Sequence, residues 1–163
     1  MRTNRLTISI FLTLLIVGLS AETTQAQRKK KRKKQKIETA IATARSYVGT
    51  PYKWGGTTKS GIDCSGLIQK SYKTIGINMP RTAKEQSKFG QKRGWDGIKP
   101  GDIVFFKFKQ KGDKWFHSGM ITSVSSSSIK FIHASTSRGV VESNLLSDYY
   151  KKNVKNFRRV IRK

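Results

Sequence analysis

Apolar side chains recur at helical spacing between residues 37 and 48 and stop at a glycine. The apolar positions in this stretch are Ile37, Ala40, Ile41, Ala44, Tyr47 and Val48. Intervals of three and four residues put them on one face of an α-helix. Gly49 follows directly, and glycine commonly ends a helix. We therefore predict an amphipathic helix over residues 37–48.

A second helix is predicted to begin at Cys64, after a loop over residues 50–62 that is rich in Gly, Thr and Ser. Asp63 can cap this helix, which should run to about Ile75 and end at Gly76. One face of it would carry Cys64, Leu67, Ile68, Ser71, Tyr72 and Ile75. We therefore expect the Cys64 thiol to point toward the body of the domain.

The pair Thr82 and Glu85 indicates a third, shorter helix. The threonine hydroxyl and the glutamate carboxylate, three residues apart, can each accept a hydrogen bond from a free backbone N–H at the helix start. We expect this helix to end by Gly90.

Beyond Lys99-Pro100-Gly101-Asp102 the chain changes to runs of β-branched and aromatic residues. The predicted strands cover residues 103–108, 115–124, 129–135, 139–143 and 157–162. Helices followed by strands are typical of an α+β domain. We predict N-terminal helices packed on an antiparallel sheet of about five or six strands.

The two histidines of the chain, His117 and His133, lie in predicted strands on either side of a serine-rich turn at residues 123–128. Each is eight residues from Ser125. A connecting loop of three or five residues would set them directly opposite each other on one face of a hairpin. An even-length loop would put them on opposite faces, so the sequence alone leaves both arrangements open.

Residues 1–26 have the pattern of a secretory signal peptide. Arg2 and Arg5 precede a mostly apolar stretch over residues 6–19, and small residues come before a cut after Ala26. The apolar stretch is shorter than the roughly 20 residues of a membrane-spanning helix, although retention as an anchor is the alternative. We expect export, cleavage after residue 26 and a soluble mature protein in the periplasm or outside the cell.

The chain is strongly basic, with a formal net charge of +25. Loss of residues 1–26 would leave +24, and eight of the remaining Lys and Arg residues lie between Arg28 and Lys36 (residues 28–36, the basic run). Like charges without apolar residues favour disorder, so residues 27–36 are predicted to form a disordered arm. This arm is either a solvated spacer or a tether to an anionic wall or membrane surface. Residues 37–163 should form the one folded domain.

Cys64 is the only cysteine, so it cannot form a disulfide within the chain. In an oxidising compartment a lone thiol is buried and inert, exposed and liable to pair between molecules, or kept for its chemistry. A helix start suggests chemistry, because the helix dipole and the unpaired N–H groups favour a thiolate. A buried structural cysteine is the ordinary alternative.

The two histidines supply the other groups that thiol catalysis needs. An imidazole takes the thiol proton and later protonates the leaving amine, and a third polar group holds that imidazole in one tautomer. His117 is the candidate base and His133 the candidate orienting residue, although a single histidine is more often an ordinary sheet residue. The close ligand pairs of structural zinc sites are missing from the sequence, so we predict neither a metal nor a cofactor.

Six motifs stand out along the chain. They are Thr50-Pro51-Tyr52-Lys53-Trp54-Gly55-Gly56, Gly61-Ile62-Asp63-Cys64-Ser65-Gly66-Leu67, Pro80-Arg81-Thr82 with Gln86, Lys99-Pro100-Gly101-Asp102-Ile103-Val104-Phe105-Phe106, His117-Ser118-Gly119-Met120-Ile121 and Phe131-Ile132-His133-Ala134-Ser135. In this order and spacing they closely resemble the NlpC family of papain-like cell-wall endopeptidases. The resemblance covers about residues 41–161 and implies a papain-like NlpC-type fold.

The resemblance also implies an activity, the hydrolysis of peptidoglycan stem peptides at the bond between γ-D-glutamate and the following diamino acid. It makes Cys64 the nucleophile, His117 the base and His133 the orienting residue.

Three further residues receive roles from the resemblance alone. Tyr52 corresponds to a tyrosine near the nucleophile, where its hydroxyl could stabilise the oxyanion. In some family members the residues beside the cysteine bind the free amine of an N-terminal L-Ala, which here would be Asp63 and Ser65.

Ser118 and Met120 differ from the residues that the family usually has at these positions, but neither difference removes a reacting group. One alternative function is a catalytically inactive module that binds the wall or another polyanion on the same fold. Another is a thiol-dependent amidase or acyltransferase. The expected partner is peptidoglycan or its stem-peptide fragments. Nucleic acid is not expected, because only the charge suggests it and the predicted leader argues against it.

Overall fold

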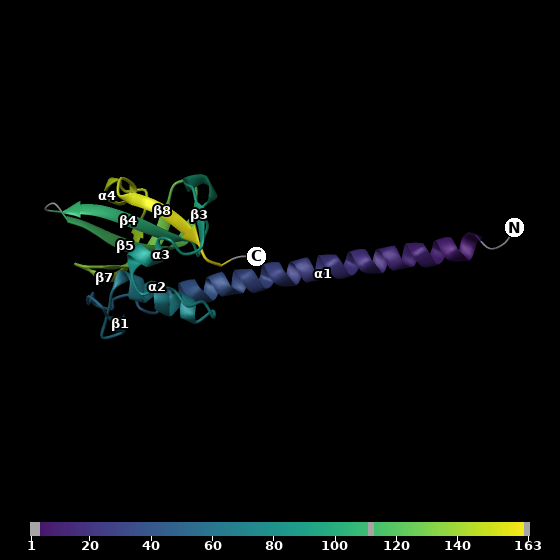
Figure 1. The fold of residues 1–163 in the computed structure, drawn as a ribbon, viewed down its shortest axis with the longest axis horizontal. Helices are drawn as coiled ribbons and strands as arrows, with labels where there is room; N and C mark the ends of the chain where they lie inside the picture. The colour runs from purple at the N-terminus through teal and green to yellow at the C-terminus, as the bar shows by residue number, and fades with distance from the viewer. Residues whose placement is uncertain (1–3, 111–112, 162–163) are drawn as a thin grey trace. The chain divides into compact units, whose positions relative to one another are not determined.

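The computed structural model describes residues 4–110 and 113–161, and the side chains of residues 24–108 and 116–161 (Figure 1). Contacts between residues divide the chain into two units, one up to residue 35 and the other Lys36–Arg162. Helix α1 (Asn4–Arg45) begins in the first unit and ends in the second.

The basic run is part of α1, whereas its charge led us to expect a disordered arm. Lys, Arg and Gln have good helix propensity, and residues in the middle of a helix do not carry the cost of nucleation. Within the described residues, no helix is both long and apolar enough to cross a membrane. The signal peptide over residues 1–26 stays a prediction, and its first three residues lie outside the described part.

The other helices are short: α2 (Cys64–Lys73), α3 (Ala83–Gln86), the 3-10 helix η1 (Trp95–Gly97) and α4 (Asp148–Lys151). The end of α1, α2 and α3 confirm the three predicted helices, although all three end earlier than expected. The predicted capping box of α3 is present in full, with Thr82 and Glu85 accepting from each other's backbone N–H. Helices η1 and α4 were not predicted, because three or four residues are too few for a periodic pattern.

The main sheet has six antiparallel strands in the order β3-β8-β4-β5-β6-β7 within the described residues. They are β3 (Gln91–Arg93), β4 (Ile103–Gln110), β5 (Asp113–Val124), β6 (Ile129–Ser135), β7 (Gly139–Asn144) and β8 (Val154–Arg159). A small hairpin joins β1 (Thr57–Thr58) and β2 (Gly61–Ile62). This confirms the predicted α+β class and the antiparallel sheet. The last strand begins and ends earlier than predicted, and Arg162 of the prediction lies outside the described residues.

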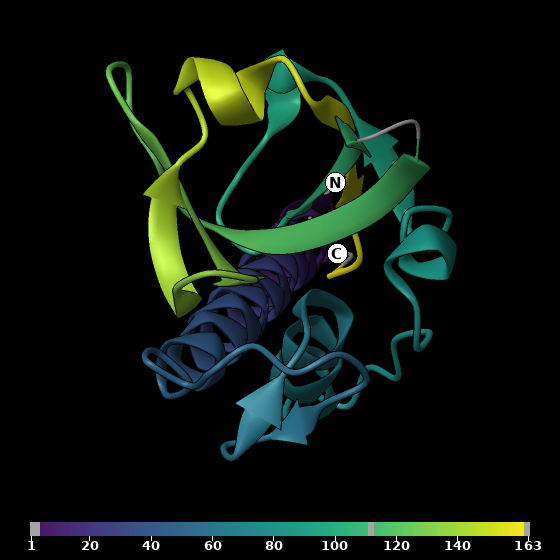
Figure 2. The ribbon, with the colours of Figure 1, turned by 90° about the vertical axis from the view of Figure 1, so that its left-hand side faces the viewer.

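Two apolar clusters lie on the two faces of this sheet, as the alternation of side chains along a strand requires. The first joins Phe105, Met120 and Ile132 to α2 and to the end of α1. The second contains Phe106 and Phe131 with other aromatic and aliphatic residues, and Tyr150 of α4 packs against it. Figure 2 shows α2 and the last turns of α1 on one side of the curved sheet and α4 on the other.

A buried ion pair ties the start of β4 to β8. Asp102 is 1% exposed and accepts two hydrogen bonds from Arg159, at 2.7 and 2.6 Å. Its carboxylate also accepts the backbone N–H of Lys99 at 2.8 Å, which closes the turn before the strand. The Pro-Gly-Asp motif therefore serves the fold, because it anchors the strand that runs beside β5.

The Asp102 carboxylate gives a test of this anchor. Asp102→Ala would leave the Arg159 guanidinium, whose side chain is 15% exposed, with the Gly97 carbonyl but without an anion, and should lower the free energy of unfolding by about 3 kcal/mol. The matched control is Glu142→Ala, which breaks the exposed pair with Arg45, whose side chain is 52% exposed. That loss should be under about 1 kcal/mol. Equal losses for the two variants in urea unfolding would contradict the assigned role.

Candidate active site

Asp63 holds the turn that leads into α2 and carries Cys64. Its carboxylate accepts the backbone N–H of Gly66 at 2.6 Å and that of Gly55 at 3.0 Å. The first contact is the predicted helix cap, and the second fastens the preceding loop to the same carboxylate. Cys64 is thereby the first residue of the helix, with only 7% of its surface exposed.

Arg81 binds the same carboxylate from the other side. Its guanidinium donates to both oxygens of Asp63, at 2.6 and 3.1 Å, and to Ser65 Oγ at 2.8 Å. Ser65 Oγ in turn donates to Asp63 at 3.0 Å. Burial alone would raise the pKa of the Asp63 carboxyl, but the hydrogen bonds from Arg81, the Gly66 N–H and Ser65 outweigh it and hold the pKa below its usual value. Asp63 is therefore an anion with its acceptor sites occupied.

The Cys64 thiol is neutral in the resting site. Burial raises its pKa and the nearby Asp63 charge raises it further, while the N–H and hydroxyl of Ser118 and the N–H of Ser65 lower it by less. We expected the helix start to favour the thiolate, but the loss of solvation of the charged form is the larger effect. Attack by this sulfur therefore requires a base.

A four-residue loop and a bulge decide where the histidines lie. Strands β5 and β6 pair at Val124 and Ile129, so the loop between them has an even length. A register shift between Ile121 and Ser123 then inserts one extra residue into β5. An insertion of one residue reverses the facing of every side chain beyond it, and so cancels the effect of the even loop.

His117 and His133 therefore share one face of the sheet, at diagonal positions. His117 Nε2 and His133 Nδ1 are 2.8 Å apart, and the two rings are close to perpendicular, at 88°. The sequence had left open whether the two histidines meet. They do, through an even loop corrected by a bulge rather than through an odd loop.

Gly119 makes room for this meeting. A β-carbon at this position would lie 2.6 Å from the ring of Phe131 and 3.2 Å from Cβ of His133. Real β-carbons do not approach other atoms as closely as the first of these distances. The glycine two residues after His117 therefore allows β5 to lie close to β6 where the imidazoles touch.

The second nitrogen of His133 also has partners. His133 Nε2 lies 3.1 Å from Ser143 Oγ on β7 and 3.2 Å from the Tyr150 hydroxyl on α4. Burial lowers the pKa of His117 to about 4 and that of His133 to about 2, and the neighbouring His117 and Arg138 lower the second further. Both imidazoles are therefore neutral near pH 7.

A groove of about 860 Å³ runs past the thiol. It is lined by Tyr52, Trp54, Gly55, Asp63, Cys64, Ser65, Arg81, Thr82, Ala83, Lys84, Phe116, His117 and Thr136. A second cavity of about 280 Å³ is lined by both histidines together with Tyr150 and Arg138. Burial raises the pKa of Tyr52 to about 12, and the Asp63 carboxylate and the ionised form of Cys64 act in the same direction, so the Tyr52 hydroxyl keeps its proton beside the thiol.

The groove brings together five residues that the sequence had singled out, Tyr52, Asp63, Cys64, Ser65 and His117. The sixth, His133, does not line the groove and contacts His117 instead.

The sequence alone indicates no role for Arg81, Ser143 or Tyr150. Arg81 stands in one of the quoted motifs, so its position was a usable indication. Ser143 and Tyr150 belong to elements that follow β6, and no spacing in the sequence connects them to His133.

The sequence pattern of the NlpC/P60 family matches residues 49–159, which include Cys64 and both histidines. A family of permuted papain-like amidases matches residues 3–93, a stretch that ends before the histidines. The chain is 38% identical to the probable endopeptidase NlpC of Escherichia coli over 71% of this chain and 73% of that protein. It is 36% identical to the E. coli murein DD-endopeptidase MepS, also named a murein LD-carboxypeptidase, over 69% of this chain and 57% of that protein.

Two further proteins show the same likeness. A γ-DL-glutamyl hydrolase of Bacillus subtilis is 39% identical over 73% of this chain, but the match spans only 28% of that protein. The crystal structure of an NlpC/P60 family protein from Bacillus cereus superposes with a TM-score of 0.68 at 30% identity, over 77% of this chain and 40% of the other. The predicted papain-like NlpC-type fold is thereby confirmed. The chain belongs to the NlpC/P60 family of cysteine endopeptidases.

Proposed function

We propose that this protein hydrolyses peptidoglycan stem peptides at the bond between γ-D-glutamate and the following diamino acid, with Cys64, His117 and His133 as its catalytic residues. The observation that carries the proposal is the 2.8 Å contact between His117 Nε2 and His133 Nδ1, beside a groove that contains both His117 and Cys64. The names of the relatives support the substrate, since one is a murein endopeptidase and another a γ-DL-glutamyl hydrolase.

The hydrogen bonds of the histidines imply one protonation pattern. For His117 Nδ1 to take the thiol proton, the hydrogen of the neutral ring must be on Nε2, which then donates to His133 Nδ1. His133 must in turn carry its hydrogen on Nε2, where Ser143 Oγ or the Tyr150 hydroxyl accepts it. In this arrangement His133 holds His117 in the tautomer that a base requires.

The reaction follows from this arrangement. The Cys64 proton passes to His117 Nδ1 as Sγ bonds to the γ-glutamyl carbonyl carbon, and the carbonyl oxygen becomes an oxyanion. Backbone N–H groups at the start of α2 and the protonated Tyr52 hydroxyl are the donors available to that oxyanion. His117 then gives its proton to the leaving amine as the C–N bond breaks. Water, deprotonated by the same imidazole, cleaves the thioester and restores the thiol.

The groove carries charges that suit a stem peptide, which has several carboxylates. Arg81 and Lys84 lie on its walls, and the whole chain is strongly basic. We keep Asp63 and Ser65 as candidates for binding a free N-terminal amine. Because the carboxylate of Asp63 already accepts five hydrogen bonds, an amine would have to share an acceptor with Arg81 or bind through Ser65.

A thiol-dependent amidase is the second candidate, because the permuted papain-like amidase family matches residues 3–93. Both reactions would use the same thiol. Defined muropeptides distinguish them, since cleavage after γ-D-glutamate and cleavage of another amide give products of different mass.

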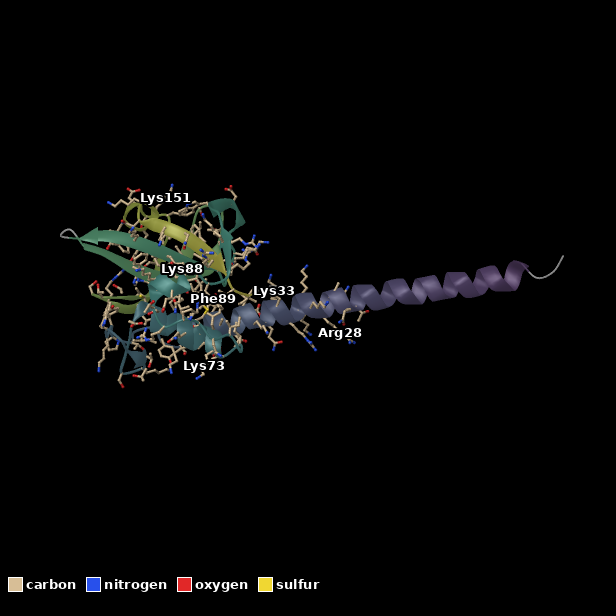
Figure 3. All side chains as sticks on the ribbon, in the orientation of Figure 1. Arg28, Lys33, Lys73, Lys88, Phe89 and Lys151 are labelled. Atoms are coloured by element: carbon tan, nitrogen blue, oxygen red, sulfur yellow. The ribbon has the colours of Figure 1, made fainter. Side chains whose placement is uncertain are left out.

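We also propose that residues 1–26 direct export and that the basic run then binds an anionic wall or membrane surface. Along α1 the side chains of Arg28 and Lys33 extend from the helix (Figure 3). All eight cationic residues of the run are exposed except Lys33, which is half-buried. Such a charge density favours anionic polymers, and the attraction should weaken as salt rises.

Removal of the nucleophile tests the reaction. Cys64→Ala should lower the release of stem-peptide fragments from purified peptidoglycan by about 10³-fold or more, because no sulfur remains to form the thioester. Ser71→Ala, a change to another small buried residue of α2, should cleave like the parent. Mass spectrometry of the soluble products measures both. Undiminished cleavage by Cys64→Ala would refute the mechanism.

The orienting role of His133 has its own test. His133→Ala should lower kcat by about tenfold or more with little change in KM, because the base would lose its tautomer while the groove stays intact. His133→Gln retains a polar partner for His117 and should recover part of the rate. Lys130→Ala, an exposed change on the same strand, serves as the control. An effect confined to KM would argue against orientation.

The basic run can be tested apart from catalysis. Replacing its eight Lys and Arg residues by Gln keeps good helix formers and should reduce sedimentation with purified cell walls at low salt. The parent protein at high salt should behave like this variant. If the two proteins sediment equally at low salt, the run is a spacer.

A further inference from the structure

Ser118 lies between the base and the glycine of the His-Ser-Gly sequence, and its side chain faces the opposite way from His117. Because side chains alternate along β5, Ser118 faces the same side of the sheet as Met120. Phe105, which pairs with Ser118 across β4 and β5, also faces that side, and this side packs on α2. Helix α2 begins with Cys64. A serine on this strand is therefore directed at the helix that carries the nucleophile.

The hydroxyl of Ser118 is buried without a regular partner. The residue is 0% exposed, and among the described residues its Oγ makes no hydrogen bond. A buried hydroxyl left in this state destabilises a protein, so an arrangement that keeps one needs a reason.

The Ser118 hydroxyl acts on Cys64, the first residue of the helix that this face of β5 packs against. Both the N–H and the hydroxyl of Ser118 act on the thiol in the direction that favours its ionised form, as does the N–H of Ser65. A neutral thiol is a weak acceptor, which fits the absence of a regular hydrogen bond in the resting site. A thiolate is an anion, and hydrogen bonds to charged acceptors are shorter and about twice as strong.

We propose that the Ser118 hydroxyl is a donor reserved for the Cys64 thiolate, unpaired while the thiol is neutral and hydrogen-bonded once the proton has moved to His117. Together with the N–H groups of Ser118 and Ser65 it forms a three-donor cradle around Sγ. The gain appears only when the sulfur carries charge, so it lowers the barrier to attack rather than stabilising the resting enzyme. The part of this inference that concerns attack rests on the proposed hydrolase function.

Other charged or titratable groups around the sulfur remain in place when Ser118 changes. They are Tyr52, Asp63, Arg81 and His117. The Asp63 charge disfavours a thiolate, while Arg81 is paired with that carboxylate. A variant of Ser118 therefore isolates the contribution of one hydroxyl.

The test measures the ionisation of Cys64 directly, through the rate of its alkylation by iodoacetamide as a function of pH. In Ser118→Ala the midpoint should move to higher pH, and the rate below the midpoint should fall about tenfold. The thermal midpoint should stay equal or rise, because the variant lacks an unpaired buried hydroxyl. A merely structural serine would show the reverse, a lower thermal midpoint with an unchanged alkylation profile, and that result would overturn the proposal.

Two sets of controls sharpen the comparison. Thr122 of β5 also has a buried hydroxyl that makes no hydrogen bond within the described part of the chain, so Thr122→Val should leave the alkylation midpoint unchanged. Ser118→Thr and Ser118→Val have nearly the same volume and differ in the hydroxyl. The first should keep a lower midpoint than the second even if both are less stable than the parent. Equal midpoints for this pair would also overturn the proposal.

Alkylation does not depend on the substrate, so the two proposals can fail separately. If the parent protein cleaves no stem peptide but Ser118→Ala still shifts the midpoint of alkylation, the role of the Ser118 hydroxyl is supported and the proposed reaction is refuted. If cleavage is normal in Ser118→Ala and the midpoint does not move, the reaction stands and the cradle falls.

Discussion

The alternation of side chains along β5 is the constraint on which the site depends. One strand presents His117 to the face that holds His133, and presents Ser118 to the face that packs on α2. If β5 slipped by one residue, every side chain would move to the opposite face of the sheet and into the wrong apolar cluster. The burial of the whole core therefore fixes the positions of both His117 and Ser118. The bulge before the hairpin turn belongs to the same constraint, because it restores the facing that the loop alone would have reversed.

Burial sets the resting charge state of the site. The imidazoles and the thiol are neutral because burial disfavours the charged form of each more than their surroundings favour it. Asp63 differs, since Arg81 and two backbone N–H groups compensate its charge and leave it as a fixed anion beside the sulfur. In the proposed reaction the Cys64 sulfur therefore acquires charge only as it reacts, and a donor such as the Ser118 hydroxyl would act at that moment.

Local chemistry explains which features could be predicted. The Asp63 cap and the Thr82–Glu85 capping box depend on residues three positions apart, and both are present as expected. The long strands could also be predicted, because their runs of apolar residues are local in sequence. The elements β3, η1 and α4 have only three or four residues and are too short to show a periodic pattern. The prediction of disorder for the basic run was wrong because it considered only the charge. The helix α1 extends on both sides of the run, and the run continues it.

Residue types and their order were enough to single out Cys64, His117 and His133 as candidates and to indicate the family. Only the tertiary structure determines whether the two histidines meet. The facing of their side chains depends on a bulge at residue 122, and the residue type at that position does not indicate a bulge. The contacts of Arg81 with Asp63, and of Ser143 and Tyr150 with His133, likewise exist only after distant segments have packed. The charge state of the Cys64 thiol is also determined only by the tertiary structure, because the loss of solvation depends on the residues packed around the thiol and not on the helix start alone.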